Sequence, residues 1–262
     1  MGRIFAIVNQ KGGVGKTTTA VNLSAALHDL GLRTLLCDFD PQANATSGLG
    51  IEKRKIKQSI YDVIINDVEP KDAIIQTKYG DVLPSSSDLA GAAVELIGTD
   101  SREYQLKNAL QKVRFDYDVI FIDCPPSLEM LTLNGLCAAD SIIVPVQCEY
   151  FALEGLADLM NTLRAVKRKM NPRLDLFGVV LTMFDGRPNF SNQVAEEVRK
   201  YFPGKVFAKC DSPERPSGGS TQPRHSRYEL RPLQPGLCGI PESGGRIPQK
   251  VGNSQVKPGK IR

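Results

Sequence analysis

A glycine-rich run with two lysines follows an apolar stretch near the start of the chain. Glycines let successive backbone N–H groups turn inward around a phosphate, and a helix that starts directly after them points its positive end at the same place. The standard pattern would begin with glycine where this chain has Gln10, whereas a variant with an extra lysine fits in full. The apolar stretch is residues 4–8, and the run consists of Lys11, Gly12, Gly13, Val14, Gly15, Lys16, Thr17 and Thr18.

The residue types in this run indicate a site for a nucleoside triphosphate. In such a loop Lys16 contacts the β- and γ-phosphates, and the Thr17 hydroxyl holds Mg²⁺. A chance glycine-rich turn is the alternative. The required order of strand, loop and helix argues against it, because residues 18–30 place apolar side chains at helical spacing directly after the loop.

Carboxylates follow two further apolar runs. Asp38 and Asp40 come after residues 34–37, and Asp123 ends residues 119–122. Ligands bind at the carboxyl ends of strands in open α/β sheets, so these side chains and the loop can share one crevice. Metal and water chemistry at such strand ends is what phosphoryl transfer requires. A solvated turn remains the alternative for Asp38 and Asp40.

The elements that must position these residues alternate between strand and helix. Helices are expected between the strands, including residues 18–30, 105–112 and 154–170. This alternation predicts an α/β fold of the P-loop NTPase type, with a mostly parallel sheet covered by helices on both faces. We expect strands near residues 3–8, 33–37, 81–84, 119–122, 141–146 and 176–182.

Composition is that of an intracellular protein. The 262 residues are 41% hydrophobic, with a mean hydropathy of −0.20, and no apolar run approaches the roughly 18 residues of a membrane span. The first strand begins at once and leaves no room for a signal peptide, so we expect a cytoplasmic location. The six cysteines show no C-x-x-C pair, and those beside strands or in an apolar helix are expected to be buried, reduced thiols.

The chain resembles the ParA-type chromosome and plasmid partitioning ATPases, within the deviant Walker A group that also holds MinD. The resemblance runs from Met1 to about Ala208. It is carried by the glycine-rich run at residues 11–18 and by three further segments. These are residues 38–46, 121–127 and 145–150, which read D-F-D-P-Q-A-N-A-T, F-I-D-C-P-P-S and P-V-Q-C-E-Y.

The resemblance implies an ATP-dependent homodimer that hydrolyses ATP with Mg²⁺. Lys11 would reach across a two-fold interface to the phosphates held by the partner subunit, and Gly12 must then stay small. Asp40 would orient the attacking water, and Asp123 would hold Mg²⁺ through its water shell. Lys11, Lys16 and Asp40 are thus the expected catalytic residues.

The same resemblance implies non-specific DNA binding, release by a ParB-type centromere-binding partner, and association with the nucleoid. Arg187 matches the arginine of the pattern L-T-M-x-D-x-R-x-N and takes the DNA-binding role. A basic cluster near the end of residues 154–170 reads as a solvated helix face that could also touch DNA phosphates. The cluster consists of Arg164, Lys167, Arg168 and Lys169.

Two other classes stay open. A MinD-like membrane-associated regulator would need a basic amphipathic C-terminal helix, which the tail does not provide convincingly, so no membrane association is expected. A metal- or cluster-carrier ATPase would need ligand cysteines, for which Cys124 and Cys137 are the candidates.

The composition changes after Ala208, which divides the chain into a P-loop ATPase domain at residues 1–208 and a tail at 209–262. The tail holds 8 of the 17 prolines and 8 of the 23 glycines and has no helix or strand period, so we expect it to be disordered. It carries 10 basic and 4 acidic residues, against 23 and 25 before it. The net charge of +4 therefore belongs to the tail and is no evidence that the domain binds DNA.

A frame slip near codons 209–210 would explain the tail. Suitable codons for residues 210–231, read from their second base, give A-I-P-Q-N-V-R-L-A-E-A-P-S-H-G-I-P-V-M-N-Y. This resembles the segment I-P-R-N-V-R-L-S-E-A-P-S-H-G that the family pattern places here. On this hypothesis the ATPase domain is incomplete at its C-terminal end and the chain's activity is impaired. The alternative is a divergent tail that serves as a basic DNA-binding arm.

Overall fold

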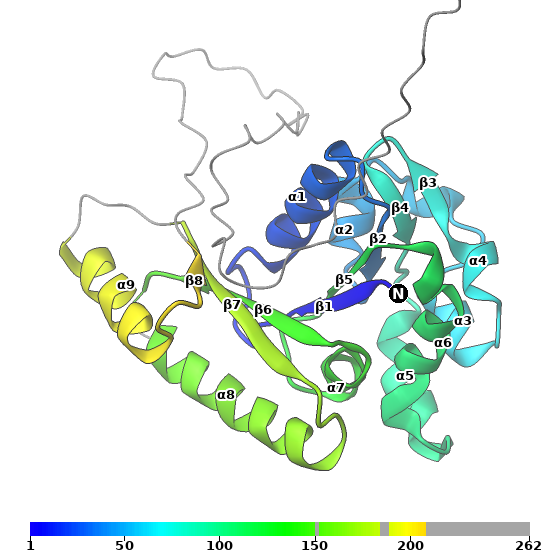
Figure 1. Ribbon diagram of the computed structural model, residues 1–262. Coiled ribbons are helices and arrows are strands. Elements are labelled where there is room, and N and C mark those ends of the chain that lie inside the picture. The colour runs from blue at the N-terminus through cyan, green and yellow to red at the C-terminus, as the bar shows by residue number, and fades with distance from the viewer. Residues whose placement is uncertain (150–151, 184–188, 208–262) are drawn as a thin grey trace, which may run out of the picture.

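The computed structural model describes residues 1–149, 152–183 and 189–207. These residues form one eight-stranded sheet with helices on both faces (Figure 1). The strands are β1 Arg3–Ile7, β2 Thr34–Asp38, β3 Ile75–Thr77, β4 Gly80–Leu83, β5 Val119–Asp123, β6 Ser141–Gln147, β7 Asp175–Thr182 and β8 Val206–Phe207. The α-helices are α1 Lys16–Asp29, α2 Asn44–Gly48, α3 Ile60–Ile65, α4 Pro70–Ala73, α5 Leu89–Glu95, α6 Gln105–Val113, α7 Met130–Ala138, α8 Ala152–Lys169 and α9 Asn189–Tyr201. Short 3-10 helices are η1 Lys53–Lys55, η2 Leu96–Gly98, η3 Arg102–Tyr104 and η4 Arg114–Asp116.

The strand order in the sheet is β3-β4-β2-β5-β1-β6-β7-β8. Neighbouring strands run parallel, apart from β3, which pairs antiparallel with β4. In the register of the three central strands, Asp123 of β5 lies beside Ile7 of β1 on one side and beside Asp38 of β2 on the other. The carboxyl ends of these strands therefore meet at one edge of the sheet, where the loop after β1 begins.

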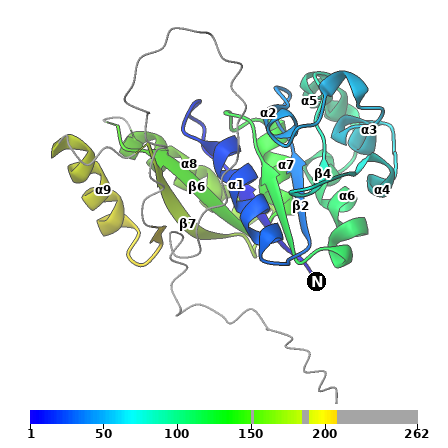
Figure 2. The ribbon, with the colours of Figure 1, turned by 90° about the horizontal axis from the view of Figure 1, so that it is seen from above.

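Side chains alternate along each central strand between two apolar layers. In β1, Ile4 and Ala6 belong to the larger layer, whereas Phe5 and Ile7 belong to the smaller one. The larger layer includes residues of α3, α6, α7 and α8, and the smaller one includes residues of α1 and α2. Seen from above, α1 lies over the strands, and α9 lies at the opposite edge from α3 and α4 (Figure 2). Burial on both faces explains why the central strands read as continuous apolar runs.

Helix α1 is positioned by its buried face and by the turn at its C-terminal end. Its buried residues Ala20 and Val21 pack with residues of the sheet in the smaller apolar layer. The helix ends at Asp29, and Gly31 follows with a φ of +85°, a conformation that glycine adopts without steric cost. The Gly31 amide donates to the His28 carbonyl oxygen at 2.8 Å. The chain can therefore turn directly from α1 into β2, which lies inside the sheet between β4 and β5.

The expected fold class is confirmed, and the six expected strands and three expected helices form within a few residues of their predicted bounds. Two short strands were missed, the antiparallel β3 and the two-residue β8. Arg187 and the tail at 209–262 lie outside the described residues. Of the helices that the structure describes, none is both long and apolar enough to cross a membrane.

Candidate nucleotide-binding site

The glycine-rich loop between β1 and α1 is anchored by hydrogen bonds to neighbouring strands. Gly13 and Gly15 adopt φ angles of +74° and +85°, which L side chains reach only with strain. Buried Asn9 donates from its side-chain amide to the Pro145 carbonyl oxygen at 2.7 Å, and its Oδ1 accepts from the Lys11 amide at 3.0 Å. The loop is therefore shaped by backbone conformation and by an anchor to β6.

A second anchor comes from the end of β7. The Thr182 hydroxyl donates to the Val14 carbonyl oxygen at 2.8 Å. Its methyl carbon lies 3.4 Å from the position that a Cβ atom on Gly15 would occupy. The loop therefore packs against the end of β7. A larger residue at position 15 would be strained by the positive φ and would also contact the Thr182 methyl group.

Lys16 begins α1 and is buried, with 7% of its surface exposed. Its Nζ donates to the Lys11 carbonyl oxygen at 3.0 Å, so the side chain folds back along the loop. Burial lowers the pKa of this ammonium, while the nearby charges of Asp123 and Asp40 oppose that shift. A phosphate inside the loop would stabilise the charged form of Lys16 in the same way that these carboxylates do.

Asp123 ends β5 and is 1% exposed. Neither carboxylate oxygen has a well-aligned hydrogen-bond partner among the described residues, although the Thr17 hydroxyl and the Lys16 ammonium lie close enough to lower its pKa. Burial raises its pKa to about 8 and the charge of Asp38 adds to this, while Thr17 and Lys16 act in the opposite direction. A buried carboxylate with free oxygens beside a threonine hydroxyl fits Mg²⁺ and its water shell, because Mg²⁺ prefers a few protein oxygens together with water and substrate phosphates.

Asp38 and Asp40 are buried as well, with 0% and 7% of their surfaces exposed. Asp38 accepts two hydrogen bonds from Thr46, from the amide and from the hydroxyl, both at 2.7 Å. The Asp40 carboxylate accepts from the Gln42 amide at 2.9 Å. Burial excludes the solvated-turn alternative for this pair. Burial also raises the pKa of Asp38 to about 6, against the effect of its bonds to Thr46.

Lys11 and Gly12 lie on the outer side of the loop. The Lys11 ammonium forms an exposed ion pair with Glu149, which follows β6. A Cβ atom added to Gly12 would have no atom of the described residues outside its own loop neighbours within 4 Å. Within a single chain, therefore, neither the long side chain of Lys11 nor the small size of Gly12 is required by local packing.

Four cysteines in the described part of the chain, Cys37, Cys124, Cys137 and Cys148, are buried free thiols, as predicted. Burial raises the pKa of Cys137 to about 11, and a thiol with such a pKa stays protonated near neutral pH. Across the described residues, no group of three or more His, Cys, Asp or Glu side chains could hold a metal ion. These observations give no support to a cluster at Cys124 and Cys137.

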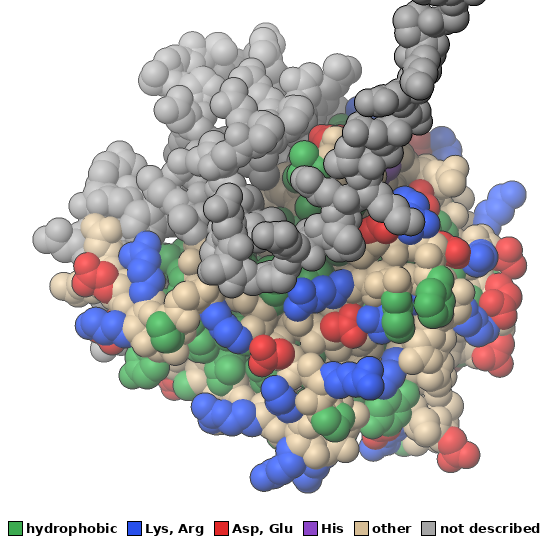
Figure 3. Space-filling model, viewed as in Figure 1, with side chains coloured by type: hydrophobic (Ala, Val, Ile, Leu, Met, Phe, Trp, Pro, Cys, Tyr) green, Lys and Arg blue, Asp and Glu red, His purple; other side chains and the backbone are tan. Residues whose placement is uncertain are grey.

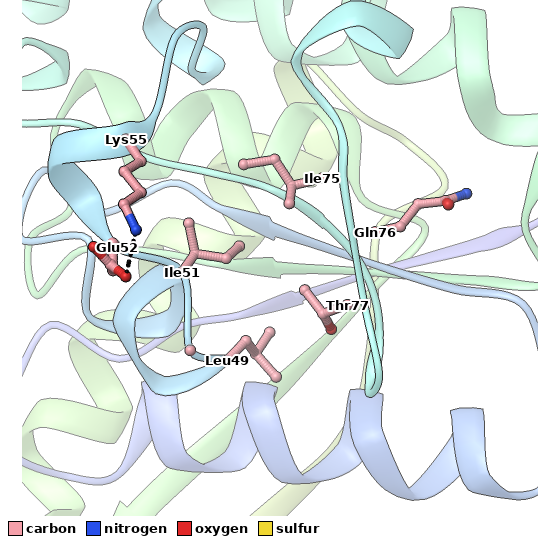
Figure 4. Close-up of a pocket in the computed structure, with 8 residues that line it drawn as sticks. Leu49, Ile51, Glu52, Lys55, Ile75, Gln76 and Thr77 are labelled. Atoms are coloured by element: carbon pink, nitrogen blue, oxygen red, sulfur yellow. Dashed lines mark hydrogen bonds and ion pairs between the residues drawn. The ribbon is translucent and has the colours of Figure 1, made fainter.

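A shallow cavity of about 430 Å³ lies apart from the phosphate loop, between the end of α2 and β3 (Figure 4). An ion pair between Lys55 and Glu52, 2.8 Å long, borders it. None of the predicted site residues lines it, so the phosphate-loop edge remains the candidate site. The lining residues are Leu49, Gly50, Ile51, Glu52, Lys55, Ile75, Gln76 and Thr77.

The structure brings the predicted residues of the loop together with Asp40 and Asp123, whereas Arg187 lies outside the described residues. Sequence reasoning assigned no role to Asn9, Thr46, Glu149 or Thr182, which hold the loop, Asp38 and Lys11 in place. The sequence offered one signal for these four residues, which is that each is a polar residue close to the end of an expected strand. That signal is weak because their partners are distant in sequence.

The fold and this edge of the sheet define the chain as a P-loop nucleotide-binding protein. A family model described as an AAA domain matches residues 2–176. The chain is 56% identical over 209 residues to the sporulation initiation inhibitor protein Soj of Bacillus subtilis, covering 79% of this chain and 83% of that protein. It is 53% identical over 209 residues to the chromosome partitioning protein ParA of Myxococcus xanthus, covering 79% and 74%. The chain therefore belongs to the ParA/Soj family of partitioning ATPases.

A solved structure from Mycobacterium smegmatis has the same fold. It is named cobyrinic acid a,c-diamide synthase and contains a bound ATP analogue and magnesium. Its sequence is 44% identical to this chain, the match covers 78% of this chain and 84% of that one, and the TM-score is 0.74. A relative of this fold therefore binds the triphosphate and cation that the site geometry suits.

Proposed function

We propose that this chain is a DNA-partitioning ATPase that uses ATP and Mg²⁺. The observation that carries the proposal is the buried carboxylate of Asp123, which lies beside Thr17 and Lys16 at the start of α1 and has no well-aligned hydrogen-bond partner among the described residues. Lys16 would bind the β- and γ-phosphates, Thr17 and Asp123 would hold Mg²⁺, and Asp40 would orient the attacking water. Phosphoryl transfer needs little beyond such positioning and charge neutralisation.

ATP would also join two copies of the chain. Lys11 is exposed and pairs with Glu149 on the surface, and an exposed pair of this kind contributes at most about 1 kcal/mol. Lys11 can therefore exchange Glu149 for a phosphate held by the partner subunit at little cost. The open space around Gly12 would then be filled by the second copy, which would explain a glycine that the single chain does not require.

After dimerisation the protein would bind non-specific DNA, and it would therefore be located on the nucleoid in the cytoplasm. A ParB-type partner would stimulate hydrolysis and so release the dimer from DNA. Figure 3 shows basic and acidic side chains interspersed over one face of the molecule. Residues 1–208 carry slightly more acidic than basic residues. DNA binding would therefore depend on a local basic site, for which Arg187 is the candidate, and on pairing two such sites in a dimer.

Phosphate release and DNA binding test this function. With Mg²⁺ we expect ATP turnover and binding to two unrelated DNA duplexes in ATP but not in ADP, at one fixed salt concentration. Lys16→Ala should reduce both by about 100-fold, since it removes a buried charge from the phosphates. The control Lys112→Ala removes an exposed lysine paired with Glu69 and should change neither. Turnover that survives Lys16→Ala would contradict the proposal.

We also propose that residues 1–208 form the ATPase domain and that the tail after Lys209 is translated out of frame. The shifted reading is constrained, because the first and third bases of each shifted codon are nearly fixed by the observed residues. The described part of the domain reaches β8, where Val206 and Phe207 pair parallel with Val179 and Val180. In the restored frame we expect β8 to continue past Leu181 and Thr182, and so beside the residue that anchors the phosphate loop.

Two measurements test the frame. The nucleotide sequence of codons 210–231 must give the shifted segment when read from the second base, and any codon that breaks it overturns the proposal. The 262-residue chain and a restored chain should then be compared for solubility, DNA binding with ATP, and turnover. We expect the restored chain to exceed the 262-residue chain in all three, because the 262-residue chain keeps the phosphate loop but lacks the end of the domain. Equal performance by both chains would make the tail a functional replacement, and inactivity of both would contradict the proposed function.

A further inference from the structure

Within the part of the chain that the structure describes, the Asp38 carboxylate accepts hydrogen bonds from the Asp40 backbone and from Thr46. Its Oδ2 accepts from the Thr46 amide and hydroxyl, each at 2.7 Å, and its Oδ1 accepts from the Asp40 amide at 3.3 Å. The side chain has no exposed surface. A carboxylate that accepts three hydrogen bonds from the chain stabilises the local backbone. It has fewer free lone pairs for a ligand than the carboxylate of Asp123 has.

Thr46 belongs to α2, a short helix that lacks a local cap. Its N-cap residue, Ala43, has a φ of +50° and makes no side-chain capping bond. Asp38 supplies the missing acceptor from the end of β2, because the first amides of a helix have no partner within the helix. The Thr46 hydroxyl oxygen in turn accepts from the Ser85 amide at 3.1 Å, just beyond β4. Asp38 and Thr46 therefore join three segments, and we call this pair the clasp.

The loop between the two clasp residues carries Asp40. At its start, the Phe39 amide donates to the Asp123 carbonyl oxygen at 2.9 Å. Inside the loop, the Ala43 amide donates to the Asp40 carbonyl oxygen at 2.8 Å. The clasp fixes the other end of the loop at Thr46, so the direction of the Asp40 carboxylate depends on it.

We propose that Asp38 is a positioning residue, which acts through Thr46 to hold the Asp40 loop in the geometry required for hydrolysis. The proposal rests on the proposed ATPase function for the role of Asp40. It assigns Asp38 no contact with nucleotide or metal. Loosening the clasp should therefore lower turnover while leaving binding of the nucleotide to the phosphate loop intact.

The variant Thr46→Val tests the clasp, because it keeps the side-chain shape and removes the hydroxyl that bonds both Asp38 and the Ser85 amide. Thr46→Ser restores the hydroxyl and serves as the rescue. Ser47→Ala is the matched control, since Ser47 is exposed on the same helix and bonds the Ala43 carbonyl oxygen. Each variant of the 262-residue chain is measured by amide hydrogen exchange, by binding of a fluorescent ATP analogue, and by turnover with Mg²⁺.

In Thr46→Val we expect amide exchange in residues 39–47 to rise by about tenfold, while the phosphate-loop amides stay unchanged. Turnover should fall by about tenfold or more with analogue affinity within about threefold of the unmodified chain. Thr46→Ser and Ser47→Ala should resemble the unmodified chain in all three measurements.

Unchanged exchange in residues 39–47 would overturn the clasp, and so would an equal loss of analogue binding and turnover. If neither the 262-residue chain nor the restored chain shows turnover, the proposed function fails, whereas the exchange comparison still decides whether the clasp holds the loop.

Discussion

Replacing Asp123 by asparagine should stabilise the protein without ligand and abolish its response to Mg²⁺ and ATP. The carboxylate is buried, its oxygens have no well-aligned hydrogen-bond partner among the described residues, and its pKa rises from 3.8 to about 8. The charge of Lys16 and the Thr17 side chain favour the ionised form, but they do not compensate for the water that it has lost. Asparagine has nearly the same shape and no charge, so it removes most of that cost.

The magnitude follows from proton linkage. Between pH 3.8 and about 8 the folded state keeps a proton on Asp123 that the unfolded state has released. The free energy of unfolding therefore falls as pH rises through this window, by up to about 1.4 kcal/mol per pH unit. At pH 7 the accumulated cost has an upper limit of about 4 kcal/mol, which asparagine would recover in part.

Urea unfolding at pH 5.5, 6.5 and 7.5 measures this effect, with and without Mg²⁺ and ATP. The unmodified chain should lose stability as pH rises and regain it with the ligands, because binding to the folded state shifts the equilibrium. Asp123→Asn should show a flatter pH dependence, higher stability at pH 7.5 without ligand, and little gain from the ligands. The control Asp72→Asn alters an exposed carboxylate. A variant that is no more stable than the unmodified chain at pH 7.5 would refute the reasoning.

Three further predictions concern the loop and its surface. Gly12→Val should leave ATP affinity within about threefold, since a side chain at this position has room in a single copy. It should prevent ATP-dependent dimerisation, because the second copy would need the same space. Light scattering with ATP measures the dimer, and a normal dimer would contradict the prediction. Gly15→Ala should cost about 1–2 kcal/mol in unfolding free energy, because Gly15 has a φ of +85°, and should weaken ATP binding; thermal melts and titrations check both, and an unchanged melt would count against the strain argument. Arg187→Ala should leave turnover without DNA unchanged and weaken DNA binding with a smaller salt dependence; unaltered binding across a salt series would remove Arg187 from the DNA site.

Local patterns carried most of the fold prediction. The order of strand, loop and helix around residues 4–30 depends on neighbours in sequence, and so does the apolar character of the central strands. The strand β3 is three residues long and β8 is two, too short for a period to be recognised. These two strands form because β4 and β7 offer them free backbone hydrogen-bonding groups, which is a tertiary contact that the local sequence does not show.

By itself the sequence determined the phosphate loop, the alternation of strands and helices and the carboxylates at strand ends, because each depends on residue types at short spacing. Tertiary structure alone decided which carboxylates are free and which are engaged. Asp38 and Asp123 both end buried strands, yet Asp38 accepts two short hydrogen bonds from Thr46, whereas Asp123 lies beside Thr17 without a well-aligned partner among the described residues. The physical reason is that parallel strands bring distant segments to one edge, and hydrogen bonding there depends on what each loop folds against.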